Sequence, residues 1–235
     1  RVLLILIYHR VLAEPDPLLR NTPDAKLFGE HLELLSSVFR PLPLSEALRR
    51  LQNGTLPRRA LCVTFDDGYA NNHDIALPIL KANGVPATVF VTTGYLDGSS
   101  MWNDRVLESV RRAPARIDLG AMGLGAWDLP DALSRYRAST QITKALQHQP
   151  SDQRLRSVEQ LVAATGARDR ERRAVDLEGA AQRPLDRGEL AVPAGEEEVA
   201  VHVPAQAARP VEATADEGRQ EAGERDVVTA GAGPD

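Results

Sequence analysis

The sequence has a single cysteine, few aromatic residues and no long apolar run. Because a disulfide needs two thiols, Cys62 cannot form one within the chain, and its place in a short apolar run predicts a small core residue. No apolar stretch approaches the roughly 20 residues of a membrane-spanning helix, so no transmembrane segment is predicted. The apolar run 2–8 is too short for a signal peptide and lacks a small-residue cleavage site, so we interpret it as a strand. Cytoplasm and cell envelope both stay open as compartments.

The chain also lacks a concentrated positive charge. Its 235 residues carry a net charge of −5 without a long basic stretch, which argues against a nucleic-acid partner. Apolar residues make up 43% and charged residues 26% of the sequence, both close to the averages of globular proteins. The composition favours a soluble enzyme that is long enough to bury a core.

The last third of the sequence lacks nine residue types. Residues 168–235 contain no Ile, Phe, Trp, Tyr, Met, Lys, Asn, Ser or Cys. Such a composition buries too little apolar surface to offset the entropy of ordering, so we expect a folded domain at 1–167 and a disordered, low-complexity tail at 168–235. Because GC-rich codons favour the residues that are present, we also hypothesise that the tail reflects a shifted reading frame beginning near Arg168.

Strands and helices alternate through the first half of the chain. The pattern predicts strands at 2–8, 60–65 and 87–91, and helices at 24–38, 45–53 and 74–82. Further helices are expected at 102–112, 130–146 and 151–165. Alternation of this kind indicates an α/β fold with a parallel sheet, whose ligand site gathers at the carboxyl ends of the strands. The residues expected at those ends are His9, Asp66, Asp67 and Thr92.

Two adjacent carboxylates follow the most apolar predicted strand. Residues 60–65 (ALCVTF) run directly into Asp66, Asp67, Gly68 and Tyr69. Neighbouring carboxylates repel each other, so they usually occur together where a metal cation or a shared proton offsets the repulsion. The alternative is a solvated Asp-Gly turn without a ligand. An aspartate-based phosphatase is disfavoured, because its D-x-D-G pattern needs another Asp two residues after the first.

Four segments resemble the polysaccharide deacetylase family, also called NodB-homology or carbohydrate esterase family 4. They are residues 4–11 (LILIYHRV), 64–69 (TFDDGY), 78–91 (PILKANGVPATVFV) and 101–104 (MWND). The resemblance covers about the first two thirds of the chain. It implies a distorted or incomplete (β/α) barrel, a carbohydrate substrate and a divalent metal, with zinc as the expected ion. It also implies that Asp66 is the general base and that Asp67 is a metal ligand.

The implied reaction is the hydrolysis of N-acetyl groups on a polysaccharide or amino-sugar oligomer. A bound metal would polarise the acetyl carbonyl, while a carboxylate takes a proton from the attacking water. The products would be acetate and a free amino sugar. Cleavage of O-acetyl esters stays open as an alternative, and the sequence names neither the sugar polymer nor the oligomeric state.

The family's remaining motifs are absent from this sequence. The family completes its metal site with a H-x-x-x-H pair, whereas no two of the five histidines here lie four residues apart. The later Arg-x-Pro-aromatic and Asp/Trp motifs are also missing. A second hypothesis is therefore a truncated, non-catalytic relic with at most carbohydrate-binding ability. The candidates for completing the site are His9, His73 and His202 as metal ligands and His9, Tyr69, Trp102 and Asn103 at the substrate, while His31 is expected to be structural.

Overall fold

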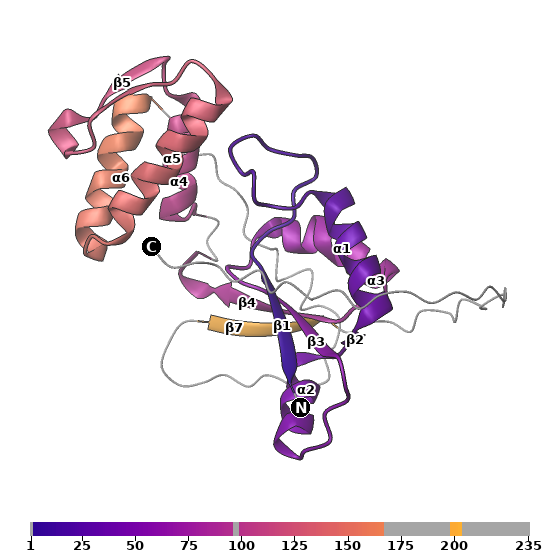
Figure 1. Cartoon of the computed structure of the whole chain (residues 1–235). Helices are drawn as coiled ribbons and strands as arrows, with labels where there is room; N and C mark the ends of the chain where they lie inside the picture. The colour runs from indigo at the N-terminus through magenta and orange to yellow at the C-terminus, as the bar shows by residue number, and fades with distance from the viewer. Residues whose placement is uncertain (1, 96–98, 167–197, 204–235) are drawn as a thin grey trace.

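The computed structural model describes residues 2–95, 99–166 and 198–203. In this part of the chain a sheet with flanking helices forms one unit, and three helices with a small hairpin form a second unit beside it (Figure 1). We call these the sheet unit and the helical unit. The candidate site lies between them.

Three parallel strands form the centre of the sheet unit. They are β1 (Leu3–Tyr8), β3 (Ala60–Phe65) and β4 (Ala87–Thr92), in the order β1-β3-β4. The short strand β2 (Arg40–Pro41) pairs in parallel with the start of β3. All six residues of β3 are buried, as expected for the central strand of a parallel sheet. The predicted parallel sheet is confirmed.

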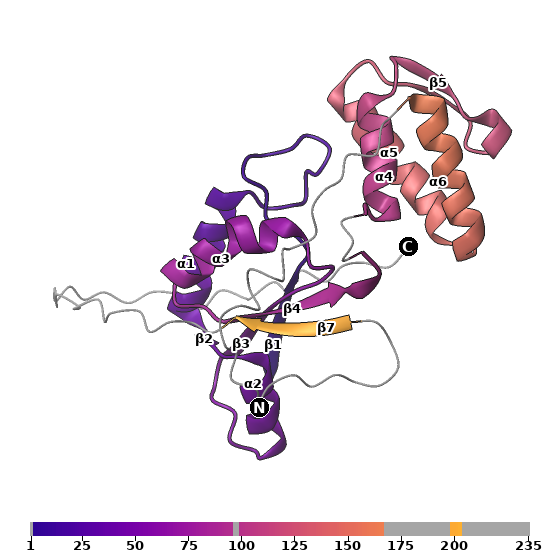
Figure 2. The same ribbon diagram turned by 180° about the vertical axis from the view of Figure 1, so that it is seen from behind.

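Helices cover the sheet as the apolar spacing predicts. Helix α1 (Ala25–Val38) begins where the Asp24 carboxylate accepts a hydrogen bond from the Leu27 N–H at 2.8 Å. Its buried Phe28 packs edge-on against Tyr8, with ring centroids 5.1 Å apart. Helix α2 (Leu44–Gln52) lies near the amino ends of β1 and β3 (Figure 2). There Cys62 is buried, and burial raises the pKa of its thiol to about 11, which confirms its place in the core.

The helix expected at 74–82 begins instead with a π-helical turn. This turn, η1 (Asn72–Ala76), is followed by α3 (Leu77–Ala82). The Leu77 N–H bonds to the Asn72 carbonyl five residues back. Pro78 has no N–H to continue the ordinary ladder, which accounts for the irregular start of this helix.

The helical unit has a core of its own. Helices α4 (Trp102–Arg112), α5 (Ala132–Gln147) and α6 (Ser151–Thr165) pack around buried apolar side chains that include Val106, Ile142 and Leu161. The bounds of α4 and α6 match the prediction. Helix α5 begins two residues later than expected, because Asp131 caps it reciprocally with Ser134.

A small hairpin joins α4 to α5. Its strands β5 (Arg116–Asp118) and β6 (Ala126–Asp128) were not predicted. Each has only three residues, which is too short for the alternation of apolar and polar side chains to reveal a strand.

One strand lies within the segment that we expected to be disordered. Strand β7 (Glu198–Val203) pairs antiparallel with β4, so the expectation is wrong for these six residues. The run EVAVHV alternates valine with other residues, a pattern that suits a strand. Residues 168–197 and 204–235 lie outside the described part, and the shifted-frame hypothesis stays a prediction.

The fold is α/β, as predicted, whereas the described strands form an open sheet rather than a closed barrel. Among the described strands, β1 pairs only with β3. Ile5 and Ile7 on this strand are 42% and 61% exposed. No helix in the described residues is both long and apolar enough to span a membrane.

Candidate active site

The carboxyl ends of β1 and β3 lie side by side. Tyr8 is paired with Phe65 in the register of the two strands, and the Asp66 N–H donates to the Tyr8 carbonyl at 2.9 Å. The chain therefore leaves the sheet at neighbouring points, once into His9 and Arg10 and once into the acidic turn. This placement confirms that residues from different strands gather at this edge.

The acidic turn has an unusual backbone conformation, which sets the direction of the Asp67 side chain. Asp67 and Gly68 have φ angles of 72° and 68°, in the left-handed region that glycine enters freely and aspartate tolerates. A Cβ on Gly68 would lie 2.8 Å from Val91 Cγ1 and 3.2 Å from Val91 Cα. Glycine is thus required at position 68, because the turn packs directly against strand β4.

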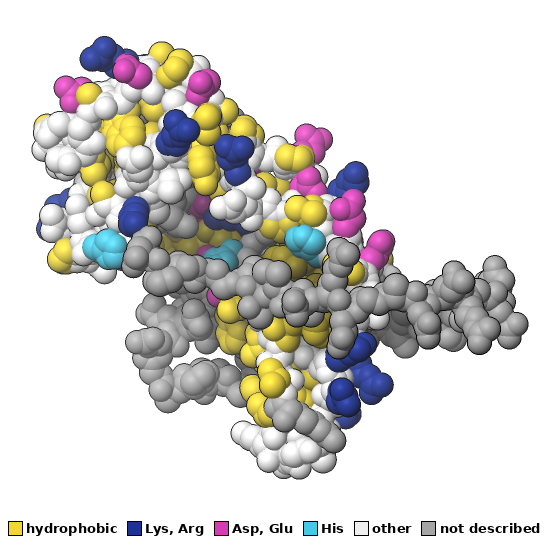
Figure 3. Space-filling model, in the orientation of Figure 1, with side chains coloured by type: hydrophobic (Ala, Val, Ile, Leu, Met, Phe, Trp, Pro, Cys, Tyr) yellow, Lys and Arg dark blue, Asp and Glu magenta, His cyan; other side chains and the backbone are white. Residues whose placement is uncertain are grey.

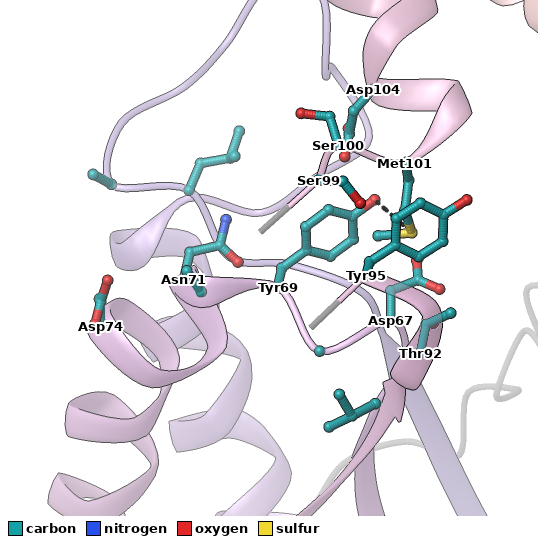
Figure 4. Close-up of a pocket in the computed structure, with 15 residues that line it drawn as sticks. Asp67, Tyr69, Asn71, Asp74, Thr92, Tyr95, Ser99, Ser100, Met101 and Asp104 are labelled. Atoms are coloured by element: carbon teal, nitrogen blue, oxygen red, sulfur yellow. Dashed lines mark hydrogen bonds between the residues drawn. The ribbon is translucent and has the colours of Figure 1, made fainter. Parts of the chain in front are cut away.

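Asp67 opens onto a cavity of about 380 Å³, within the range of small-molecule sites. Figure 4 shows the tyrosine rings of its wall and the Asp67 carboxylate facing one space. The wall mixes hydroxyl groups and aromatic faces, which suits a polar ligand with apolar C–H surfaces. The side chains that line it come from the acidic turn, the end of β4, the start of α4 and the intervening loops, and include Asp67, Tyr69, Asn71, Thr92, Tyr95, Ser100, Met101 and Asp104.

Burial raises the pKa of the Asp67 carboxyl above its ordinary value. The nearby His9 lowers this pKa and Asp66 raises it. Smaller effects come from Arg10, which lowers the pKa, and from Asp104, which raises it. Burial disfavours the charged form, so a cation placed at this carboxylate would relieve an existing cost.

A buried ion pair closes one wall of the cavity. Arg10 Nη2 donates to Asp104 Oδ1 at 2.8 Å, and both side chains are 7% exposed. The Arg10 guanidinium carbon also lies 3.7 Å from the centroid of the Tyr69 ring, a cation–π contact. Burial raises the pKa of the Tyr69 hydroxyl, so this residue is a neutral hydrogen-bonding group at physiological pH.

The structure separates the histidine candidates. His9 is exposed next to the acidic turn, near enough to influence the pKa of Asp67. His73 lies on the surface with its Nδ1 2.9 Å from Asp74 Oδ1. His31 Nδ1 lies 3.4 Å from the Tyr8 hydroxyl oxygen, which fits the structural role expected for it. His202 is in β7, where its backbone lies opposite that of Thr88 in β4.

The two aromatic candidates lie in different surroundings. Tyr69 lines the cavity, as a substrate-binding role requires. Trp102 packs against the core of the helical unit, and the Arg154 guanidinium carbon lies 4.9 Å from its ring centroid. These contacts indicate that Trp102 anchors its helix, whereas the sequence indicated it as a candidate at the substrate.

The sequence did not single out Arg10, Tyr95 or Asp104 as site residues. Arg10 follows the more conspicuous His9, and Asp104 stands in the first turn of a helix, where an acidic residue is ordinary. Only the folded chain shows that Asp104 faces a guanidinium from 94 residues earlier.

A complete catalytic zinc site needs about three protein ligands and an open position. Within residues 2–95, 99–166 and 198–203, no group of three His, Cys, Asp or Glu side chains is placed to hold a metal ion. The donors found there do not fit a complete zinc site, although Asp67 could supply one ligand.

The geometry defines an α/β protein with an acidic cavity at the ends of its parallel strands. The polysaccharide deacetylase family matches residues 53–171, just over half of the 235-residue chain. The chain belongs to the polysaccharide deacetylase family.

Its similarity to individual proteins is confined to short segments. A poly-β-1,6-N-acetyl-D-glucosamine N-deacetylase of Staphylococcus epidermidis is 32% identical over 66 residues, which is 28% of this chain and 23% of that protein. The Staphylococcus aureus protein of the same name is 36% identical over 62 residues, 26% of this chain and 21% of the relative. The match thus spans less than a quarter of the length of these relatives.

Two solved deacetylase structures are similar to 44% and 68% of this chain. IcaB from Ammonifex degensii is 32% identical, with a TM-score of 0.37, covering 44% of this chain and 46% of its own. Streptococcus pyogenes deacetylase PplD, solved with acetate, is 19% identical with a TM-score of 0.37, covering 68% of this chain and 80% of its own.

We expect Arg10→Met to lower the free energy of unfolding by about 3–5 kcal/mol, because it leaves the Asp104 carboxylate buried without its partner. Urea denaturation measures this change. The double variant Arg10→Met/Asp104→Leu should recover much of the loss. Lys26→Met serves as the control, since its pair with Glu30 is exposed and is expected to contribute at most about 1 kcal/mol. A single Arg10→Met variant as stable as the control would contradict this account.

Asp67→Asn should raise the melting temperature at neutral pH. A raised pKa in the folded state means that the stability associated with the protonated carboxyl is present in acid and is lost as the pH rises through that pKa. The neutral amide avoids this loss, and asparagine also accepts the left-handed backbone. The gain should vanish below the ordinary aspartate pKa of about 3.9. Melting curves across pH test this, with the exposed Asp128→Asn as control; equal melting temperatures of the wild type and Asp67→Asn at neutral pH would refute it.

Proposed function

We propose that the chain is a hydrolase that removes N-acetyl groups from an amino-sugar polymer. The observation that supports this most directly is the acidic turn at the carboxyl end of β3, which opens onto the cavity lined by tyrosine rings and hydroxyl groups. This turn lies within the part of the chain that matches the family. The relatives named for poly-β-1,6-N-acetyl-D-glucosamine suggest β-1,6-linked N-acetylglucosamine as the first substrate to test.

In this proposal Asp66 acts as the general base. Its carboxylate takes a proton from water as the water oxygen attacks the acetyl carbonyl carbon. The C–N bond then breaks as the amine nitrogen takes up the proton that Asp66 accepted, so that the Asp66 carboxylate is regenerated and the free amine and acetate are released. A positioned base of this kind contributes typically 10²–10⁴-fold to a rate. The exposed His9 lies beside the same turn and is proposed to contact the substrate there.

The proposal includes a divalent metal, with zinc as the expected ion and Asp67 as one ligand. Support for this comes from the burial of the Asp67 carboxylate, whose charge a cation would offset. The described donors make up only part of such a site. We therefore assign no catalytic step to the metal.

A closed (β/α) barrel is the finer fold that we propose. The support is the edge of β1, where no further described strand pairs and the apolar Ile5 and Ile7 are exposed. Exposed apolar edge strands invite pairing with another strand. An additional strand would pair with the backbone at this edge, and its own side chains would pack beside Ile5 and Ile7.

A second candidate function is carbohydrate binding without catalysis. It is favoured by the incomplete set of metal donors in the described part of the chain. The cavity and its tyrosine rings would then hold a sugar that is not hydrolysed. O-acetyl ester cleavage is a variant of the first proposal, since the same base and cavity would serve an ester.

The Asp66→Asn variant should lower kcat/KM for acetate release from β-1,6-linked N-acetylglucosamine oligomers by about 10²–10⁴-fold, because it removes the base. Oligomer binding should persist, since the amide has nearly the same shape. Asp118→Asn, in the distant hairpin, is the control. Unchanged acetate release by Asp66→Asn would overturn the assignment, and a wild type that binds oligomers without releasing acetate would favour the binding function.

Zinc binding can be measured without any substrate. By calorimetry we expect the chain to bind Zn²⁺ weakly, since Asp67 is one ligand where about three are usual. Asp67→Ala should remove the binding, whereas Asp66→Asn should retain it. Zinc affinity that is unaffected by Asp67→Ala would refute Asp67 as a ligand.

A further inference from the structure

A second cavity lies on the other side of the buried ion pair. It has a volume of about 430 Å³ and is bounded by the loop after β1, by α4 and by α5. Asp104 lines both this cavity and the acidic one, while Arg10 lines only the second. In the space-filling view the surface is hollowed where the helical unit meets the sheet unit (Figure 3). The two cavities are therefore neighbours that share one wall.

One polar face of α5 forms a wall of the second cavity. Ser139, Thr143 and Gln147 follow each other at intervals of four residues, so they lie in a row along the helix. Thr140 and Lys144 form a parallel row beside them. The opposite face of α5 packs into the core of the helical unit. Ser139 is buried, whereas Thr140, Thr143, Lys144 and Gln147 are partly or fully exposed at the cavity and are available to a ligand.

The hydroxyl groups of this face can accept hydrogen bonds from a ligand. Ser139 Oγ and Thr140 Oγ1 each donate to the Tyr136 carbonyl at 2.9 Å, which uses their hydrogen atoms within the helix. Each oxygen keeps lone pairs that a hydroxyl donor could reach. The amides of Asn103 and Gln147, from α4 and α5, add both donors and acceptors at the same cavity.

Apolar side chains line the remaining wall. Leu18 and Leu19 come from the loop after β1, and Leu107 comes from α4. The Arg10 charge is paired with Asp104, so Lys144 contributes most of the positive character. Neutral hydrogen-bonding groups facing leucines suit a ligand with many hydroxyls and an apolar C–H face. A pyranose ring has both features, whereas an anion would use only part of this lining.

We infer that the second cavity is a subsite for another sugar unit of the polysaccharide that is proposed to bind in the cavity at Asp67. The shared wall at Asp104 places the two cavities next to each other, as consecutive units of one chain require. The inference rests on the proposed carbohydrate substrate. It adds that the helical unit contributes to recognition through α5, and that the affinity for oligomers rises with their length.

The test measures binding rather than turnover. The probes are N-acetylglucosamine and its β-1,6-linked di-, tetra- and hexasaccharides, titrated into the full chain by calorimetry. Wild-type affinity should rise from the monosaccharide to the longer oligomers. Thr143→Leu removes a hydroxyl, fills part of the cavity and preserves helix propensity, so it should lower hexasaccharide affinity about fivefold to tenfold, the effect of roughly one hydrogen bond. Monosaccharide binding should not change.

Gln141→Leu is the matched control, because Gln141 is exposed on the same helix and does not line the cavity. Gln147→Ala is a second test variant that keeps the inference falsifiable if Thr143→Leu fails to fold. Both test variants should flatten the dependence of affinity on oligomer length, and Gln141→Leu should retain it.

Each outcome bears on the inference separately from the reaction. Hexasaccharide binding that neither variant weakens would overturn the subsite, even if the chain releases acetate. Loss of length-dependent binding in both variants would support it, even if no acetate is released. If inorganic phosphate binds and Thr143→Leu weakens that binding while sugars do not bind, the cavity is an anion site and the inference is wrong.

Discussion

The buried ion pair between Arg10 and Asp104 joins the two units of the described structure. Arg10 follows β1, and Asp104 lies in the first turn of α4. Because a charge left without its partner in a buried position is costly, the pair holds the start of the helical unit against the end of the sheet. The same pair forms the wall between the two cavities. The relative position of the acidic turn and α5 therefore depends on this contact.

The acidic turn depends on a second constraint, the close approach of Gly68 to Val91 on β4. The turn has no room for a side chain at position 68, and the left-handed backbone at positions 67 and 68 sets the direction of the Asp67 carboxylate. Burial then makes this carboxylate costly to ionise. Strained backbone and a disfavoured charge commonly occur together at functional sites, because the free energy of ligand binding can offset the cost of both.

Membership of the polysaccharide deacetylase family leads one to expect a complete metal site, whereas the described residues supply only part of one. The matched segment contains the acidic pair, while the described residues bring no three metal donors together. The cavities are formed independently of a metal, because they rest on packing between β4, α4, α5 and the loop after β1. The proposed sugar binding and the proposed catalysis can therefore be tested separately, because binding measurements address the first without the second.

The sequence by itself determined the parallel β1, β3 and β4, the helices α1, α4 and α6, and the position of Asp66 and Asp67 at a strand end. These features are local, since apolar periodicity, the Asp24 cap and turn residues act within a few positions along the chain. The hairpin of β5 and β6 and the strand β7 were too short or too unusual in composition to be predicted. Only the tertiary structure decided three features: the pairing of Arg10 with Asp104, the packing of Gly68 on Val91 and the second cavity beside α5. Each of them brings together segments that are far apart in the chain, and no local sequence pattern indicates that such segments will be close in space.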